Sequence, residues 1–157
     1  TLPRLARPRR VWRAFGLGCG TDRKENAMQR AVIAGSVYFL LLFAFGFLLG
    51  IVRVLLVIPY VGTLVATMLE VPVMLAAAYV VCPRVIRRFK VPPERPARWV
   101  MALVFLILLA LFESALGSLL FNRTMADQWA ALSTPAGMLG LSAQIIAALF
   151  PLRIATP

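Results

Sequence analysis

The feature that most constrains this chain is an apolar run from Ala31 to Val52 in which no side chain is charged. At about 1.5 Å rise per residue, a helix of this length crosses a hydrocarbon core of about 30 Å. The run is too long for the apolar core of a signal peptide, and no small-x-small cleavage pattern follows it. The sequence therefore predicts a membrane-spanning helix rather than a removed leader.

Three more apolar runs follow the first. The predicted spans are residues 31–58, 60–82, 99–121 and 130–152. We expect a turn at Pro59, a stiff proline-rich linker at 91–96 and a short loop at 122–129 between them. Hydrophobic residues make up 61% of the chain, well above the roughly 45 to 50% of soluble domains. The sequence thus predicts an all-α integral membrane bundle of four transmembrane helices over residues 31–153.

Basic residues predict that both ends of the chain lie on one side of the membrane. All but two of the 17 Lys and Arg residues precede the first span, lie in the 83–98 segment, or are Arg153. The two exceptions are Arg53, near the outer end of the first span, and Arg123, which follows the third span. The positive-inside rule therefore predicts cytoplasmic N and C termini, with the basic face toward anionic lipid. This accounts for the net charge of +11 without a nucleic-acid partner.

Residues 1–30 are strongly basic and contain several prolines and glycines. One interpretation is a cytoplasmic tail that is disordered or lies on the headgroups. The other is that Met28, just ahead of the first span, is the native start, so that residues 1–27 precede it without a function. Cys19 and Cys82 lie in unrelated segments on the predicted reducing side, so no disulfide is expected.

Three charged residues lie inside or at the edge of the predicted spans: Arg53, Glu70 and Glu113. A charge at the centre of a span costs about 2.5 to 3.5 kcal/mol, so each should face the bundle interior, a partner or water. Helix rise places both acids about 12 to 15 Å below the outer ends of their helices, within reach of the arginine. The sequence therefore predicts one intramembrane polar cluster.

Three roles stay open for this cluster. It is a polar pin that fixes helix packing, a surface that binds a polar residue of a partner, or a proton or cation relay between two coupled carboxylates. Pro72 lies two residues after Glu70 and predicts a kink or local unwinding beside that carboxylate.

Small and polar residues predict where the helices pack closely. Gly46 and Gly50 form a GxxxG pattern in the first span, and Ser114 and Ser118 repeat small residues four apart in the third. Gln144 in the fourth span has an amide that can form a hydrogen bond across the bundle. We expect these five residues at helix contacts.

The sequence contains no recognisable catalytic or metal-binding set. Histidine is absent from it, so the usual base for a Ser or Cys nucleophile and the commonest ligand of zinc, copper and haem iron are missing. Both lysines lie on the predicted cytoplasmic side, which argues against a Ser–Lys pair within the membrane. We expect no enzyme activity, no metal and no cofactor.

Several segments resemble a family of small bacterial inner-membrane proteins with four helices and no assigned activity. They are the stretch from Gly50 to Gly62, the segment from Glu70 to Leu75, and the later Thr134–Gly137. The resemblance covers roughly residues 28–153. It implies a multipass protein of the bacterial inner (plasma) membrane that starts at Met28, and it carries no mechanism.

Two function classes follow from these features. Short loops, few polar positions and small-residue faces favour a non-catalytic accessory or assembly subunit that contacts other membrane subunits or itself. The alternative is a small oligomeric transporter or channel, coupled to protons or cations through Glu70 and Glu113. The two differ in whether neutralising a carboxylate alters assembly or flux.

Overall fold

The computed structural model describes residues 19–154, with side chains from Lys24 onward except at 120 and 121. Four long helices span this part: α1 (Cys19–Val52), α2 (Ile58–Phe89), α3 (Arg95–Phe121) and α5 (Pro135–Arg153). A π-helical turn, η1 (Arg53–Val57), joins α1 to α2, and the short α4 (Met125–Leu132) precedes α5. The all-α prediction is confirmed for the described residues.

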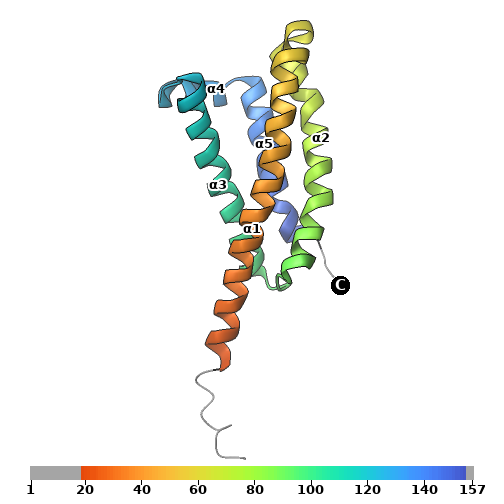
Figure 1. The fold of residues 1–157 in the computed structure, drawn as a ribbon, viewed down its shortest axis with the longest axis vertical. Coiled ribbons are helices and arrows are strands. Elements are labelled where there is room, and N and C mark those ends of the chain that lie inside the picture. Colours follow the sequence, from red (N-terminus) through yellow and green to blue (C-terminus); the bar gives the residue numbers. More distant parts are fainter. Residues whose placement is uncertain (1–18, 155–157) are drawn as a thin grey trace, which may run out of the picture.

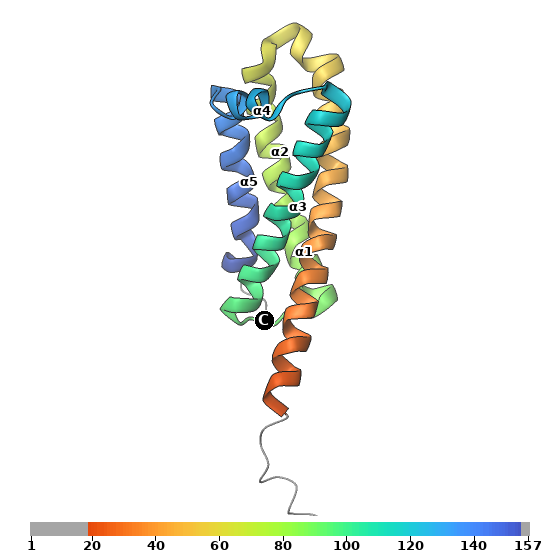
Figure 2. The same ribbon diagram turned by 90° about the vertical axis from the view of Figure 1, so that its left-hand side faces the viewer.

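The four long helices form a bundle in which each helix packs against two others (Figure 1). Helix α1 lies between α2 and α3, and α5 lies between the same two helices, so α1 and α5 are diagonal to each other. The α1–α2 turn and α4 lie at one end, and the α2–α3 linker lies at the other (Figures 1 and 2). We call these the α4 half and the linker half.

Three continuous helical stretches are long and apolar enough to cross a membrane, judged by length and composition. They are Lys24–Phe89, Arg95–Leu119 and Pro135–Arg153. The first has 66 residues, because helical geometry continues through η1, yet its two arms run antiparallel (Figure 2).

The reversal between these two arms is at Gly62, where φ is 77° and ψ is 168°. Only glycine adopts such angles without strain. The predicted turn at Pro59 is therefore wrong: Pro59 lies in the first turn of α2, where a missing backbone N–H is tolerated.

Helix α1 begins at Cys19 rather than at the predicted Ala31. Residues 19–30 are thus helical and not part of a disordered tail, while the prediction for residues 1–18 lies outside the described residues. This segment contains Ala, Met, Gln, Lys, Glu and Arg, which have high helix propensity. The helix therefore continues beyond the apolar run and extends past the linker end of the bundle (Figure 1).

The predicted fourth span, 130–152, is divided between two helices. Thr134 caps the second of them: its hydroxyl accepts a hydrogen bond from the Gly137 N–H at 3.1 Å, and Pro135 occupies the first turn of α5. A Cβ at Gly137 would collide with the Ala131 carbonyl, so the chain folds back tightly here. The predicted loop at 122–129 contains most of α4 instead.

The linker half holds the densest part of the core. Tyr38 and Phe39 of α1, Ile86 of α2 and Met101 of α3 are fully buried there. The Tyr38 hydroxyl crosses the bundle diagonal and donates a hydrogen bond to the Ala147 carbonyl of α5 at 3.0 Å. This half of the bundle is closed by side chains from every long helix.

Two features at the linker end tighten this closure. A Cβ on Gly35 would lie 2.8 Å from the Met101 carbonyl oxygen, so α1 and α3 approach each other closely at this glycine. Arg98, only 4% exposed, donates to the Pro92 carbonyl of the linker at 3.0 Å and to the Pro151 carbonyl of α5 at 3.4 Å.

Candidate functional site: a polar-lined cavity

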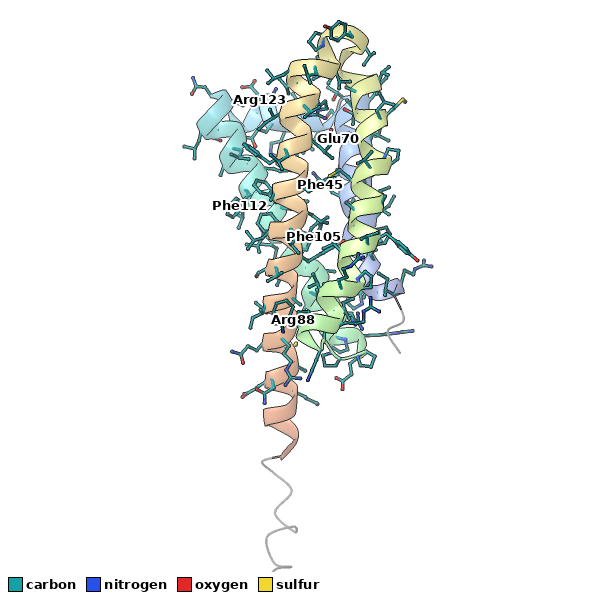
Figure 3. The ribbon with its side chains drawn as sticks, turned by 45° about the vertical axis from the view of Figure 1, so that its right-hand side comes forward. Phe45, Glu70, Arg88, Phe105, Phe112 and Arg123 are labelled. Atoms are coloured by element: carbon teal, nitrogen blue, oxygen red, sulfur yellow. The ribbon has the colours of Figure 1, made fainter. Side chains whose placement is uncertain are left out.

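The α4 half of the bundle contains a cavity of about 900 Å³, with walls from α1, η1, α2, α3 and α5. Most of its lining is aliphatic or aromatic. The polar side chains on its walls are Arg53, Thr63, Thr67, Glu70, Glu113, Arg123, Thr134 and Gln144. Glu70 and Arg123 lie toward the α4 end and Arg88 toward the other (Figure 3). The cavity is thus an amphipathic space in one half of the molecule.

One wall carries an ion pair between Arg53 and Glu70. The Arg53 Nη1 lies 2.9 Å from Glu70 Oε2 and 3.3 Å from Thr67 Oγ1, and the Thr67 hydroxyl in turn donates to the Thr63 carbonyl. The arginine and glutamate side chains are 32% and 18% exposed. Arg53 opens the π-helical turn, so this pair ties the end of the first arm to the second.

A second polar pair lies between α3 and α5. The Gln144 Nε2 donates a hydrogen bond to Glu113 Oε1 at 2.6 Å. Gln144 thus bonds across two helices, as its position in the sequence indicated. The Glu113 side chain is nevertheless exposed, because α3 diverges from α1 toward the α4 end (Figure 1).

The structure therefore divides the predicted cluster into two pairs. Arg53 meets Glu70, as expected, but Glu113 meets Gln144 instead of the arginine. The reason is helix order: η1 and α2 are neighbours and α3 and α5 are neighbours, whereas α2 and α3 are diagonal. Both carboxylates line the same cavity, one in each pair.

The predicted packing residues have unequal roles. A Cβ at Gly46 would touch the Met74 Cε of α2 at 3.0 Å, so this glycine lies at a helix contact. Gly50 has no heavy atom within 4 Å of such a Cβ, and it lines the cavity. Within this chain, Gly46 therefore lies at a helix contact and Gly50 does not. At Pro72 the helix continues, and the departure from helical angles within α2 is at Gly62 instead.

Ser114 and Ser118 do not join α3 to another long helix. Both accept hydrogen bonds from the Gln128 amide of α4, at 3.3 Å to the Ser114 carbonyl and 3.1 Å to the Ser118 hydroxyl. Gly117 between them leaves room for that amide. These small residues hold α4 at the end of the bundle rather than forming a helix–helix contact.

The sequence predicts only a loop between α3 and α4, whereas the structure has a capping box at the start of α4. The Thr124 hydroxyl accepts from the Asp127 N–H, and the Thr124 N–H donates to Asp127 Oδ2 at 2.9 Å. Hydrogen bonds from the Thr124 hydroxyl and N–H, with the nearby Arg123 charge, hold the pKa of Asp127 below its ordinary value. Thr followed three residues later by an acid is a recognisable signal for this motif.

Among residues 19–154, no group of three or more Cys, Asp and Glu side chains could hold a metal ion. Comparison of the chain with protein-family models, with curated proteins and with solved structures gives no match. The resemblance to small bacterial inner-membrane proteins therefore stays a prediction.

Proposed function

We propose that this chain is a non-catalytic multipass membrane protein that serves as an accessory or assembly subunit. In this proposal the α4 half is the surface that binds a partner membrane chain. The observation that carries this proposal is the unequal closure of the bundle. Side chains fill the linker half around Tyr38, whereas the α4 half keeps a cavity of about 900 Å³ with polar groups on its walls. A partly open space with a few polar groups on apolar walls is available to an occupant from outside the chain.

The charge distribution supports an orientation with both termini in the cytoplasm of a bacterium. Basic side chains gather at the linker end, along the segment from Arg84 to Lys90 and at Arg153. Arg53 and Arg123 are the basic residues on the cavity wall, toward the other end. Under the positive-inside rule the linker end faces the cytoplasm and anionic lipid, and the half that contains the cavity lies toward the outer face of the inner membrane.

A second candidate is a transporter or channel that uses Glu70 and Glu113. In its favour, both carboxylates line one cavity. Against it, each is engaged in a separate pair, and the described linker half is closed below the cavity by buried side chains such as Tyr38 and Met101. A carrier would have to open that core, so the accessory role is the better supported of the two.

The test is extraction of the tagged chain in mild detergent at its natural expression level, followed by native mass analysis. The proposal expects a stoichiometric complex with other membrane chains. Gly140→Leu, which places a bulky side chain in the cavity, should release the partner, and Ser142→Leu on the exposed side of the same helix should not. Recovery of a homo-oligomer alone would contradict the accessory role and make flux measurements with Glu70→Gln and Glu113→Gln the next step.

A further inference from the structure

The charged groups of the α4 half are unequally matched. Arg53 is paired with Glu70 at 2.9 Å, and Arg123 lies close enough to Asp127 to lower the pKa of that carboxyl. Glu113 has a neutral partner, the Gln144 amide, and no basic side chain lies within ion-pair distance of it among the described residues. This carboxylate is therefore the acid of the cavity that lacks a cation.

An amide donor satisfies one carboxylate oxygen but does not compensate its charge. A carboxylate surrounded by apolar residues within a membrane is costly unless a cation accompanies it or a proton neutralises it. Glu113 is also exposed toward the cavity side of α3, so an occupant can reach it. While this carboxyl group is ionised, a group that brings a positive charge would complete the site.

The remaining walls favour an occupant with a large apolar body. Phe43 and Phe47 of α1 and Phe105 of α3 line the cavity, and aromatic faces attract organic cations as well as apolar groups. A Cβ at Gly50 or Gly140 would meet no atom within 4 Å, so these positions keep the space open. A cavity of about 900 Å³ is in the range that holds small organic ligands, roughly 300 to 1,000 Å³.

We infer that this cavity is a binding site for an amphipathic organic cation, whose charge pairs with Glu113 and whose apolar body lies against Phe43, Phe47 and Phe105. The inference concerns the same cavity as the proposed partner-binding surface, but it does not depend on the accessory role, because the residues that would bind the cation all belong to this chain. Recovery of a partner and binding of a cation are separate measurements, so either can fail without the other.

The experiment compares two probes of nearly equal size and opposite charge, tetraphenylphosphonium and tetraphenylborate. Equilibrium binding is measured on the full chain in nanodiscs of zwitterionic lipid, with empty nanodiscs subtracted. We expect saturable binding of the phosphonium at one site per chain and no saturable binding of the borate. Saturable binding of the borate alone, or of neither probe, would overturn the inference.

Variants locate the site. Glu113→Gln keeps the size of the side chain and should weaken phosphonium binding at least tenfold, whereas Glu94→Gln, at an exposed carboxylate of the linker, should leave it unchanged. If Glu113→Gln does not fold, Gly140→Leu tests the same site, because it places a bulky side chain in the cavity and retains the carboxylate. Wild-type affinity in Glu113→Gln or in folded Gly140→Leu would contradict the assignment.

Discussion

Two glycines of α1, one in each half of the bundle, have opposite surroundings. In the linker half, Gly35 lets α1 approach the backbone of α3 so closely that a Cβ would lie 2.8 Å from the Met101 carbonyl. In the α4 half, Gly50 of the same helix faces open space. A small residue permits close approach, but only a facing element that fills the gap produces it. Small-residue patterns alone therefore do not distinguish a helix contact from a cavity wall.

The largest effect on stability is expected at the Arg53–Glu70 ion pair, which joins the two arms in the half of the bundle that is not closed by apolar packing. Arg53→Met leaves Glu70 without its cation and should cost about 2 kcal/mol, between the values for exposed and buried pairs, since both side chains are partly exposed. Hydrogen exchange should rise in η1 and the start of α2 and stay unchanged around Tyr38. The double variant Arg53→Met/Glu70→Met should regain most of the loss in thermal unfolding. If hydrogen exchange rose equally in both halves of the bundle, the claim that the two halves are stabilised independently would be wrong.

The glycine contrast gives a matched pair of substitutions. Gly35→Ala should destabilise the fold by about 1 to 2 kcal/mol, because α1 and α3 must move apart. Gly50→Ala should be neutral or stabilise by up to about 1 kcal/mol, since a helical glycine is replaced without a clash. Thermal unfolding in one detergent compares them directly, and the reverse order would contradict the assignment of packed and open halves.

A smaller loss is expected from the hydrogen bond across the linker half. Tyr38→Phe removes the donor to the Ala147 carbonyl and keeps the ring, so the cost should be about 1 kcal/mol. The matched change in the α4 half, Gln144→Met, removes the amide that bonds to Glu113. Tyr38→Phe should raise the rate of hydrogen exchange in the linker half alone, and Gln144→Met should raise it in the α4 half alone.

The smallest effect concerns the cap of α4 and its dependence on pH. The pKa of Asp127 is lowered in the folded state, so its contribution to stability is present above its unfolded pKa and is lost as pH falls through the folded pKa. The cap should therefore persist at neutral pH and weaken only below the ordinary value of about 3.9. A carbon-13 titration of the Asp127 carboxyl should show a low midpoint, and Thr124→Ala should raise it.

The long helices that carry the charged residues were predictable because apolar run length and helix rise determine them. The pairing was not, since it depends on which helices are neighbours: the position of Glu113 in the sequence does not show that α3 packs beside α5 and lies diagonal to α2. The sequence predicts that Gln144 forms a hydrogen bond across the bundle, but it does not identify Glu113 as the acceptor.

Local signals explain the remaining differences. Thr134 followed by Pro135 marks a helix start, yet the apolar residues around them extended the predicted fourth span across the break. Gly62, three residues after Pro59, was the better signal for the reversal, because the turn needs a positive φ and proline cannot supply one. For Arg98 the sequence predicts only a position in the basic linker segment. Its hydrogen bonds to the Pro92 and Pro151 carbonyls depend on tertiary structure.

The central claim is that one half of the bundle is closed and the other holds an accessible cavity. The most direct test places single cysteines on α5, at Gly140 in the cavity and at Ala148 in the packed half, in a chain that lacks Cys19 and Cys82. Open membrane fragments, in which both faces of the membrane are accessible, are treated with a membrane-impermeant thiol reagent. The account predicts rapid labelling at position 140 and protection at position 148; equal labelling at both positions, or labelling at 148 alone, would contradict it.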